Sequence, residues 1–350
     1  PEFIIGARGH DFGRQTPEAL FSAIGQAGFR CTQLAFTKAI EGVKSYADVT
    51  PSLVEAARAA SKASNVGIAV DGTYVELSYA DEDKRKAEVA KVLSQIPVAK
   101  ALGAGCMGSE TTNMAKQPGI SRKEAQEALL RSLGEILPAC EEQGVLFAVE
   151  CVYYHAMNTP EAVKMELDTM ASPNLRVICD FANYVGPENA SVDAQRRLWD
   201  KVGSWYGDKI VAVHFKGQNF QPDGTLYSTS LEDSCVDYAG GFEMLRQMPQ
   251  ASLPVLREEA VPARRKYALA GMNYTLRNLG DGFAMFDGAE LIKDYVSEDY
   301  LVMSSYAMMF GGADGDGLPH LTSANSPLAD YPGYLLDYEN PYGAGRITIL

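Results

Sequence analysis

The stretch Val145-Leu-Phe-Ala-Val-Glu-Cys-Val-Tyr-Tyr-His155 combines a β-strand pattern with two side chains that can do chemistry. Its apolar, partly β-branched start predicts a buried strand. The strand ends on the carboxylate of Glu150, and the imidazole of His155 follows five residues later. Three later stretches also run apolar and end on a side chain that can bind a metal: Val177-Ile-Cys-Asp180, Val211-Ala-Val-His214 and Pro254-Val-Leu-Arg-Glu-Glu259.

Strands and helices alternate on both sides of these stretches. Threonine–proline pairs that begin at Thr16, Thr50 and Thr159 predict helix starts, with threonine as the N-cap and proline in the first turn. We expect strands within residues 3–12 and at 31–36, 66–71, 104–108, 145–150, 175–180, 210–216 and 254–259. Eight strand–helix units in about 280 residues match the size of a (β/α)₈ TIM barrel, an α/β fold. A doubly wound sheet would also alternate, but polar residues at the C-terminal strand ends favour the barrel.

The alternation predicts two regions. Residues 1–280 form the barrel, with its last helix at about 264–279. Residues 281–350 are rich in Tyr, Gly, Pro and Asp and form a C-terminal extension, with helices expected near 288–296 and 299–310. Because this extension is too aromatic for a plain disordered linker, we expect it to pack on the barrel or on a partner.

Composition narrows the class of protein. The formal charge of -14 and the pI near 4.8 argue against nucleic acid or an anionic membrane as the main partner, since both are polyanions. No signal-peptide pattern opens the chain, and no apolar run approaches the roughly 18 residues of a membrane span. The six cysteines lack CxxC spacing and read as buried thiols. We therefore expect a cytoplasmic enzyme.

The residues that end the four strands form a candidate metal site. Two carboxylates, an imidazole and a further carboxylate are an N/O ligand set for one divalent ion, with Mn²⁺ (manganese) as first choice and Mg²⁺, Co²⁺ or Zn²⁺ as alternatives. A single Glu at a strand end is usually a cap or an ion-pair partner, but four in register on successive strands are hard to explain that way. Strand alternation places only one of Glu258 and Glu259 inside, and the pattern does not say which.

Four phrases resemble the xylose-isomerase-like TIM-barrel family of sugar isomerases and epimerases over roughly residues 3–280: Ala148-Val-Glu150, Cys179-Asp-Phe-Ala-Asn183, Val213-His-Phe-Lys216 and Arg257-Glu258. The resemblance implies that Glu150, Asp180, His214 and Glu258 hold the ion. The chain also departs from the family pattern. After the fifth strand the family has Glu-Asn-His, whereas this chain has Glu150-Cys-Val-Tyr-Tyr-His155. Asn183 stands where the family has a histidine, and Gly217 stands where it often has an aspartate.

Further polar residues are candidates for substrate chemistry. His155 follows the fifth strand closely enough to reach the C-terminal end of the barrel, where it could act as a general acid or base. Alternatively, it is a structural histidine of the loop. Lys216 either pairs with a ligand carboxylate or donates to a substrate oxygen. His10 and Asn183 are candidate substrate-binding residues. With Glu150 and Glu258 as possible acid and base, the candidate catalytic set is Glu150, His155, Lys216 and Glu258.

These residues lead to two enzyme hypotheses. The first is a metal-dependent isomerase or epimerase of carbohydrate metabolism, which enolises a sugar or keto-sugar by abstracting a proton next to a carbonyl that the metal polarises. The second rests on the departures from the family pattern and on the aromatic C-terminal extension, and it is a lyase that resembles the large (alpha) subunit of bacterial C-glycoside deglycosidases. Such a subunit cleaves the C–C glycosidic bond of 3-oxo-C-glycosides by elimination and works with a small β-rich partner subunit.

Two other classes fit the sequence less well. An abasic-site endonuclease would carry more metal ligands and a basic surface, and a non-catalytic sugar-binding barrel would need a vestigial site. We expect an oligomer that acts on a small carbohydrate or glycoside.

Overall fold

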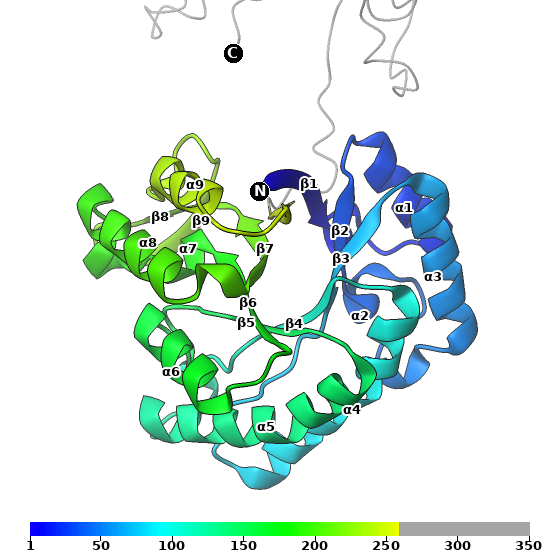
Figure 1. Cartoon of the computed structure of the whole chain (residues 1–350), viewed down its shortest axis with the longest axis horizontal. Coiled ribbons are helices and arrows are strands. Elements are labelled where there is room, and N and C mark those ends of the chain that lie inside the picture. Colours follow the sequence, from blue (N-terminus) through cyan, green and yellow to red (C-terminus); the bar gives the residue numbers. More distant parts are fainter. Residues whose placement is uncertain (259–350) are drawn as a thin grey trace, which may run out of the picture. The chain divides into compact units, whose positions relative to one another are not determined.

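The computed structural model describes residues 1–258, and in this part of the chain eight parallel strands close into a barrel (Figure 1). Around the barrel the strand order is β1-β10-β7-β6-β5-β4-β3-β2. The strands are β1 (Glu2–Arg8), β2 (Cys31–Leu34), β3 (Gly67–Gly72), β4 (Cys106–Glu110), β5 (Phe147–Glu150), β6 (Leu175–Asp180), β7 (Ile210–Phe215) and β10 (Ser252–Arg257). The predicted (β/α)₈ barrel is thus confirmed.

Helices cover the outside of the barrel (Figure 1). They are α1 (Pro17–Gln26), α2 (Phe36–Ala39), α3 (Pro51–Ser64), α4 (Glu82–Leu102), α5 (Arg122–Gln143), α6 (Pro160–Met170), α7 (Phe181–Tyr184), α8 (Val192–Tyr206) and α9 (Tyr238–Arg246). Short 3₁₀ turns lie at Gly9–Phe12, Tyr46–Asp48, Met114–Lys116, Pro187–Asn189 and Gly207–Lys209. The side chains of Thr16, Thr50 and Thr159 cap α1, α3 and α6, with proline in the first turn, as predicted.

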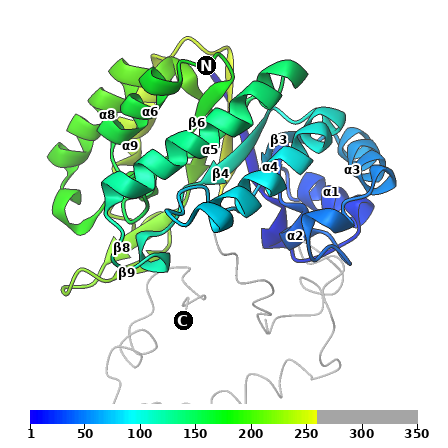
Figure 2. The same cartoon turned by 90° about the horizontal axis from the view of Figure 1, so that it is seen from below.

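A small antiparallel hairpin, which we did not predict, follows the seventh barrel strand. It consists of β8 (Gly217–Phe220) and β9 (Leu226–Thr229). In Figure 2 it projects from the barrel end opposite the N-terminus of the chain. β8 is buried to half-buried and β9 is mostly exposed, and neither four-residue strand shows the apolar alternation that marks a strand in sequence. Gly224, at φ 83°, makes the turn.

The fourth barrel strand begins and ends two residues later than the expected 104–108. Gly103 ends helix α4 in the left-handed conformation, and Gly105 passes so close to β3 that a Cβ there would lie 2.8 Å from the carbonyl oxygen of Ala69. The strand therefore continues to Glu110, which becomes another carboxylate at a C-terminal strand end. The predicted helix at 264–279, the extension 281–350 and Glu259 lie outside the described residues.

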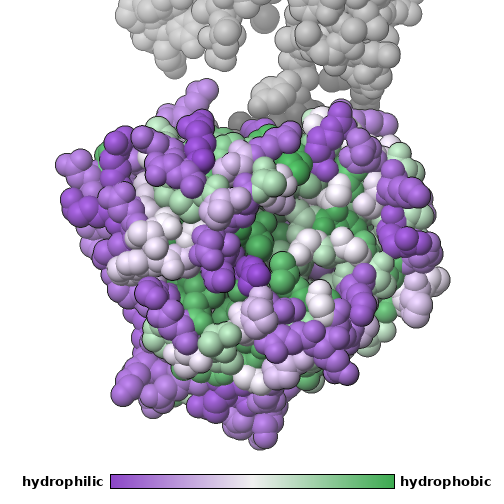
Figure 3. All heavy atoms as spheres, viewed as in Figure 1, coloured by the Kyte–Doolittle hydropathy of each residue, from purple (hydrophilic) through white to green (hydrophobic). Residues whose placement is uncertain are grey.

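Alternation along the strands divides the core into an inner and an outer part. Small and medium side chains fill the barrel interior, namely Cys31, Ala69, Val70, Cys106, Ala148, Ile178, Ala212 and Leu256. Two larger apolar clusters lie between strands and helices. Figure 3 shows hydrophobic residues gathered in the middle of one face, inside a rim of hydrophilic ones. All six cysteines are free, and all but Cys235 are buried.

Within residues 1–258, no helix has the length and apolar character needed to cross a membrane.

Candidate metal centre

Three side chains converge where β5, β6 and β7 end. Glu150, Asp180 and His214 each offer a ligand atom, and these atoms lie within 4.8 Å of one another. Asp180 and His214 are paired neighbours in the β6–β7 register. Since Ala148, Ile178 and Ala212 point into the barrel, the residues two positions later point inward as well. All three ligand residues are buried.

Glu258, the residue after β10, lies beside this cluster. Its Oε1 is 3.0 Å from Nδ1 of His214, and Oε2 of Glu150 is 3.1 Å from the same nitrogen. The other oxygen of Glu258, Oε2, accepts a hydrogen bond from Arg8 at 3.1 Å and lies 3.6 Å from Nζ of Lys216. Glu258 is therefore the member of the Glu258–Glu259 pair that the described structure places at the site.

Lys216 and Asn183 connect the acidic residues. Nζ of Lys216 lies 2.7 Å from Oδ2 of Asp180 and donates to Oδ1 of Asn183 at 2.9 Å. The amide nitrogen of Asn183 donates to Oε1 of Glu150 at 2.5 Å. Asn183 belongs to the short helix α7, whose N-cap is Asp180 itself. Asp180 thus positions the turn that carries Asn183, and Asn183 in turn holds Glu150.

The charges of the cluster depend on one another. Burial, together with Glu150 and Glu258, raises the pKa of Asp180 against the opposing effect of Lys216. Burial would also raise the pKa of Glu258, but His214, Lys216 and Arg8 outweigh it and hold that pKa well below its usual range. Burial disfavours the charged form of Lys216, yet Asp180 and Glu258 raise its pKa well above normal. The buried acids therefore need nearby positive charge to remain ionised.

The donor set fits a divalent cation. Nδ1 of His214 and Oδ2 of Asp180 are buried and form no hydrogen bond of good geometry among residues 1–258, although two carboxylate oxygens lie 3.0 and 3.1 Å from Nδ1 and Nζ of Lys216 lies 2.7 Å from Oδ2. Ring nitrogen and carboxylate oxygen are the ligand atoms that Mn²⁺, Mg²⁺, Co²⁺ and Zn²⁺ accept. Glu150, Asp180 and His214 would hold the ion, and Glu258 would be a further ligand.

Two histidines named from the sequence lie outside the ligand cluster. His155 is buried, with Nε2 3.9 Å from Oε2 of Glu110, and burial lowers its pKa to about 4. His10 packs edge-on against Tyr74 at 5.9 Å between ring centroids, and burial and Arg8 lower its pKa to about 4. Both rings are therefore neutral near pH 7, and the catalytic and substrate-binding roles assigned to them stay predictions.

Sequence reasoning missed three residues of the site: Gln33, Glu110 and Arg8. Burial and Glu150 raise the pKa of Glu110 to about 7, although 41% of its side chain stays exposed. Oε1 of Gln33 lies 2.8 Å from Nε2 of His214. Both Gln33 and Glu110 are polar residues at or near strand ends, so they carried a usable signal. Arg8 did not, because its role depends on the contact with Glu258, 250 residues away.

Aromatic side chains flank the loop after β5. The rings of Tyr153 and Tyr154 meet edge-on at 5.0 Å between centroids, and Tyr153 also meets Phe220 of the hairpin at 6.3 Å. Tyr154 packs edge-on against His155 at 4.8 Å and leaves 37% of its surface exposed. This loop and the hairpin both follow C-terminal strand ends, so the aromatic rings lie at the mouth of the barrel.

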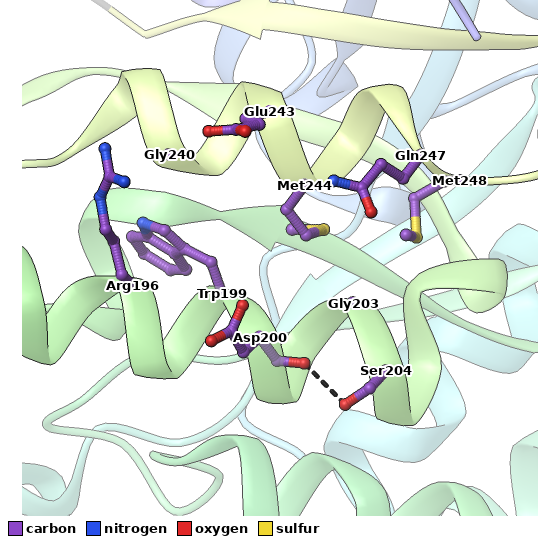
Figure 4. A pocket seen from close by; sticks show the side chains of 10 residues that line it. All are labelled: Arg196, Trp199, Asp200, Gly203, Ser204, Gly240, Glu243, Met244, Gln247 and Met248. Atoms are coloured by element: carbon purple, nitrogen blue, oxygen red, sulfur yellow. Dashed lines mark hydrogen bonds between the residues drawn. The ribbon is translucent and has the colours of Figure 1, made fainter.

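A separate hollow of about 700 Å³ lies on the outside of the barrel between α8 and α9 (Figure 4). Trp199, Met244 and Met248 line it together with polar residues such as Arg196 and Glu243. No set of three metal-binding side chains converges there among the described residues. The helices, and not the strand ends, form this hollow, so we place the functional site at the barrel mouth.

Comparisons with known proteins agree with this architecture. A family model described as xylose isomerase-like TIM barrel matches residues 21–273. One similar solved structure is the IolI protein with a bound zinc atom, with 13% identity, 74% of this chain and 91% of that chain covered, and a TM-score of 0.60. A D-tagatose 3-epimerase-like protein has 15% identity, coverage of 74% and 93%, and a TM-score of 0.58. The 3-keto-D-glucoside 4-epimerase YcjR from E. coli has 16% identity, coverage of 76% and 94%, and a TM-score of 0.58.

At these identities the similarity to solved structures shows the fold alone. No curated protein sequence matched the chain.

Proposed function

The chain belongs to the xylose isomerase-like TIM barrel family, and from this premise we propose that it is a divalent-metal-dependent enzyme that enolises a sugar or keto-sugar. The observation that carries the proposal is the convergence of Glu150, Asp180 and His214 within 4.8 Å at the C-terminal strand ends. In TIM-barrel enzymes this end holds the active site. The similar structures named as a D-tagatose 3-epimerase-like protein and a 3-keto-D-glucoside 4-epimerase support a sugar or keto-sugar as substrate.

A bound divalent ion would supply Lewis-acid polarisation of a substrate carbonyl. The protein's own groups then handle the proton on the neighbouring carbon. Glu150 and Glu258 approach Nδ1 of His214 from different strands, so the two carboxylates can reach different sides of a substrate held between them. One carboxylate accepts the C–H proton while the bond electrons move toward the carbonyl oxygen. Epimerisation follows if the other carboxylate returns a proton to the opposite face of the carbon.

Other side chains prepare these carboxylates. Asn183 engages Oε1 of Glu150, which leaves Oε2 facing the site. Arg8 and Lys216 hold Oε2 of Glu258 and leave Oε1 facing His214. The ammonium group of Lys216 can also donate a hydrogen bond to a substrate oxygen. Glu110 and His155 form a second carboxylate–imidazole pair at the mouth, which suits proton transfer to substrate hydroxyls.

Deuterium exchange tests the proposal without requiring the natural substrate. The Mn²⁺-loaded protein is incubated in D₂O with D-tagatose, D-fructose or a 3-keto-glucoside, and NMR follows deuterium entering next to the carbonyl. We expect exchange that stops with EDTA, returns with Mn²⁺ and is lost in Glu150→Gln. Full turnover by metal-free protein would refute the metal-dependent mechanism.

The aromatic rings at the mouth favour a second candidate, the C-glycoside deglycosidase alpha subunit. Tyr153, Tyr154 and Phe220 offer faces and edges against which an aromatic aglycone can pack. The same first proton abstraction next to a 3-keto group, followed by β-elimination, would cleave the C–C bond. The electron pair of the C–H bond would form a C=C bond in the sugar, the electron pair of the C–C bond would pass to the aglycone carbon, and that carbon would take up a proton. The products would be an unsaturated 3-keto sugar and the free arene. Release of the free aglycone from a 3-oxo-C-glycoside, measured by chromatography, separates this reaction from epimerisation.

Assembly distinguishes the two candidates further. The deglycosidase function predicts that the chain is active only with a small β-rich partner subunit, whereas an epimerase is active as a homo-oligomer. Light scattering of the purified chain, with activity measured on the same fractions, tests this. Epimerisation of free ketoses by a homo-oligomer would rule out the deglycosidase.

A further inference from the structure

Gln33 is a polar residue inside the barrel that contacts His214. It lies on β2, almost opposite the strands that carry the ligands, and is 5% exposed. Its Oε1 is 2.8 Å from Nε2 of His214, and its Nε2 donates to the hydroxyl of Tyr74 at 3.1 Å. We propose that Gln33 is a positioning residue that fixes the His214 ring so that Nδ1 is the ligand atom.

The backbone is shaped to bring Gln33 to this place. Gln33 lies two positions after the inward-facing Cys31, and the pairing between β2 and β3 shifts register beside it, where Ala69 of β3 has no partner between Ile68 and Val70. Across the bulge, Gly72 leaves room for the amide, because a Cβ at this position would lie 2.9 Å from Nε2 of Gln33. A barrel interior filled only with apolar side chains would need neither the register shift nor the glycine. Together these two features make room for the amide of Gln33.

The hydrogen bonds of this amide orient the imidazole. An amide oxygen can only accept, so Nε2 of His214 must carry a hydrogen when it faces Oε1 of Gln33. Nδ1 is then the nitrogen whose hydrogen a bound cation would displace, and it faces Glu150 and Glu258 at 3.1 and 3.0 Å. If the amide were reversed, its NH₂ group would occupy the lone pair on Nε2 and place the hydrogen on Nδ1, among the carboxylates. That arrangement would block the cation.

Tyr74 contacts the other end of the amide. Its hydroxyl accepts from Nε2 of Gln33, and burial raises the pKa of Tyr74 so that the hydroxyl remains protonated and neutral. The backbone nitrogen of Tyr74 in turn donates to the hydroxyl of Tyr46 at 2.9 Å. A chain of hydrogen bonds therefore runs from the loop after β3 to the ring nitrogen of His214. Partners of this kind commonly tune metal affinity by 10–100-fold.

This inference rests on the proposed function, because it assumes that His214 binds a metal. The first test is Mn²⁺ affinity, measured by calorimetry on the metal-stripped full chain, for Gln33→Met and Gln33→Glu. Methionine keeps the volume but offers only a weak acceptor, so we expect affinity to fall about 10–100-fold. Glutamate still accepts from Nε2–H, so we expect it to keep affinity within about threefold of the wild type.

Gln95→Met is the matched control. Gln95 is also buried, at 2% exposed, but it lies on α4 and bonds Ser94 far from the ligands. Its Mn²⁺ affinity should equal that of the wild type. The thermal unfolding temperature of all three variants, measured in EDTA, shows whether a loss of affinity comes from a misfolded barrel. A variant that has lost only the hydrogen bond to His214 should still unfold cooperatively.

The second readout observes the ring directly. The chain has 4 histidines, so long-range ¹H–¹⁵N spectra of the Zn²⁺-loaded protein resolve each ring. We expect His214 to show metal on Nδ1 and a slowly exchanging hydrogen on Nε2, and Gln33→Met to lose that slow exchange. Metal on Nε2 in the wild type would overturn the inference.

Three affinity outcomes separate the hypotheses. If the wild type fails to bind Mn²⁺ or Zn²⁺, the proposed function itself is wrong. If the wild type binds and Gln33→Met binds equally well, the role of Gln33 is wrong and the metal site stands. If Gln33→Met and Gln33→Glu lose affinity equally, the hydrogen bond to Nε2 is not the cause, and the inference is likewise refuted.

Discussion

The inner and outer faces of the barrel both bury carboxyl groups, but they treat them differently. On the inner face, Glu150, Asp180 and Glu258 surround His214 and share Lys216. On the outer side, Asp71 of β3 and Glu166 of α6 are buried one at a time, and buried oxygens of both lack hydrogen-bond partners among the described residues. Asp71 pairs in register with Leu34, a member of the outer apolar cluster, and so points away from the interior.

The difference shows that a buried acid does not by itself make a binding site. Burial raises the pKa of Asp71 to about 7 and that of Glu166 well above its usual range, because no cationic group compensates the lost hydration. In the inner cluster, His214, Lys216 and Arg8 hold the pKa of Glu258 low despite equal burial. A cation needs several donor atoms that converge, which the inner cluster provides and which the singly buried Asp71 and Glu166 do not.

The largest effect should come from removing an inner carboxylate. Asp180→Asn removes the charge of a candidate ligand whose Oδ2 lies 2.7 Å from Nζ of Lys216. We expect activity to fall by more than about 10³-fold, which is above about 4 kcal/mol in activation free energy. Mn²⁺ affinity should fall by more than the roughly 100-fold that is lost when a residue holding a ligand is changed. Calorimetry and the deuterium-exchange assay measure both.

The outer carboxyl Glu166 supplies the matched control for that experiment. Glu166→Gln makes the same type of change at an equally buried position on α6. Its activity and Mn²⁺ affinity should stay at the wild-type level. Equal losses in Asp180→Asn and Glu166→Gln would mean that the distinction between the two faces has no functional meaning.

The fold was predictable because strand ends, threonine caps and apolar runs are local signals. The candidate ligands Glu150, Asp180 and His214 followed from the same signals, since each lies at or near the end of an apolar strand. Gln33 could be noticed as a polar residue near a strand end, but its contact with His214 could not be predicted, because the contact depends on the pairing of β2 with β3 and on the missing side chain of Gly72. Such features belong to strand pairing, which one strand's sequence does not encode.

The next largest effect should be a pH dependence of stability caused by Asp71. Its pKa of about 7 in the folded protein exceeds the usual value, so the folded state holds the proton more tightly than the unfolded chain does. Between about pH 4 and 7, unfolding therefore releases this proton, and stability falls as pH rises, by up to about 4 kcal/mol. Urea unfolding across this range should show a shallower decline in Asp71→Asn.

An exposed aspartate checks that this effect comes from burial. Asp208 leaves 57% of its side chain exposed. Asp208→Asn should reproduce the wild-type pH profile between pH 4 and 7. A wild-type profile in Asp71→Asn as well would show that Asp71 gains solvent or a partner in solution, and the contrast between the faces would weaken.

Metal addition should stabilise the protein through the inner cluster alone. At a free Mn²⁺ concentration of about 100 times Kd, linkage predicts a gain of about 2.7 kcal/mol in the free energy of unfolding. Differential scanning fluorimetry with and without Mn²⁺ measures the shift. Glu166→Gln should show the full shift and Asp180→Asn none, whereas a shift in Asp180→Asn would place the ion elsewhere.

The smallest effect concerns polar groups on the outer face that do have partners. The hydroxyls of Tyr184 and Tyr206 lie 3.0 Å apart in a buried position next to the helices. Tyr184→Phe leaves the Tyr206 hydroxyl unpaired, so we expect a loss of about 1–2 kcal/mol in urea unfolding and no change in Mn²⁺ affinity. The double change Tyr184→Phe with Tyr206→Phe removes both polar groups and should recover part of that loss. If the double variant loses as much as two independent single changes, the two hydroxyls are not coupled. The polar groups of the outer face would then be stabilised by water or by packing. The polar groups of the inner face, in contrast, are stabilised by pairing directly with one another.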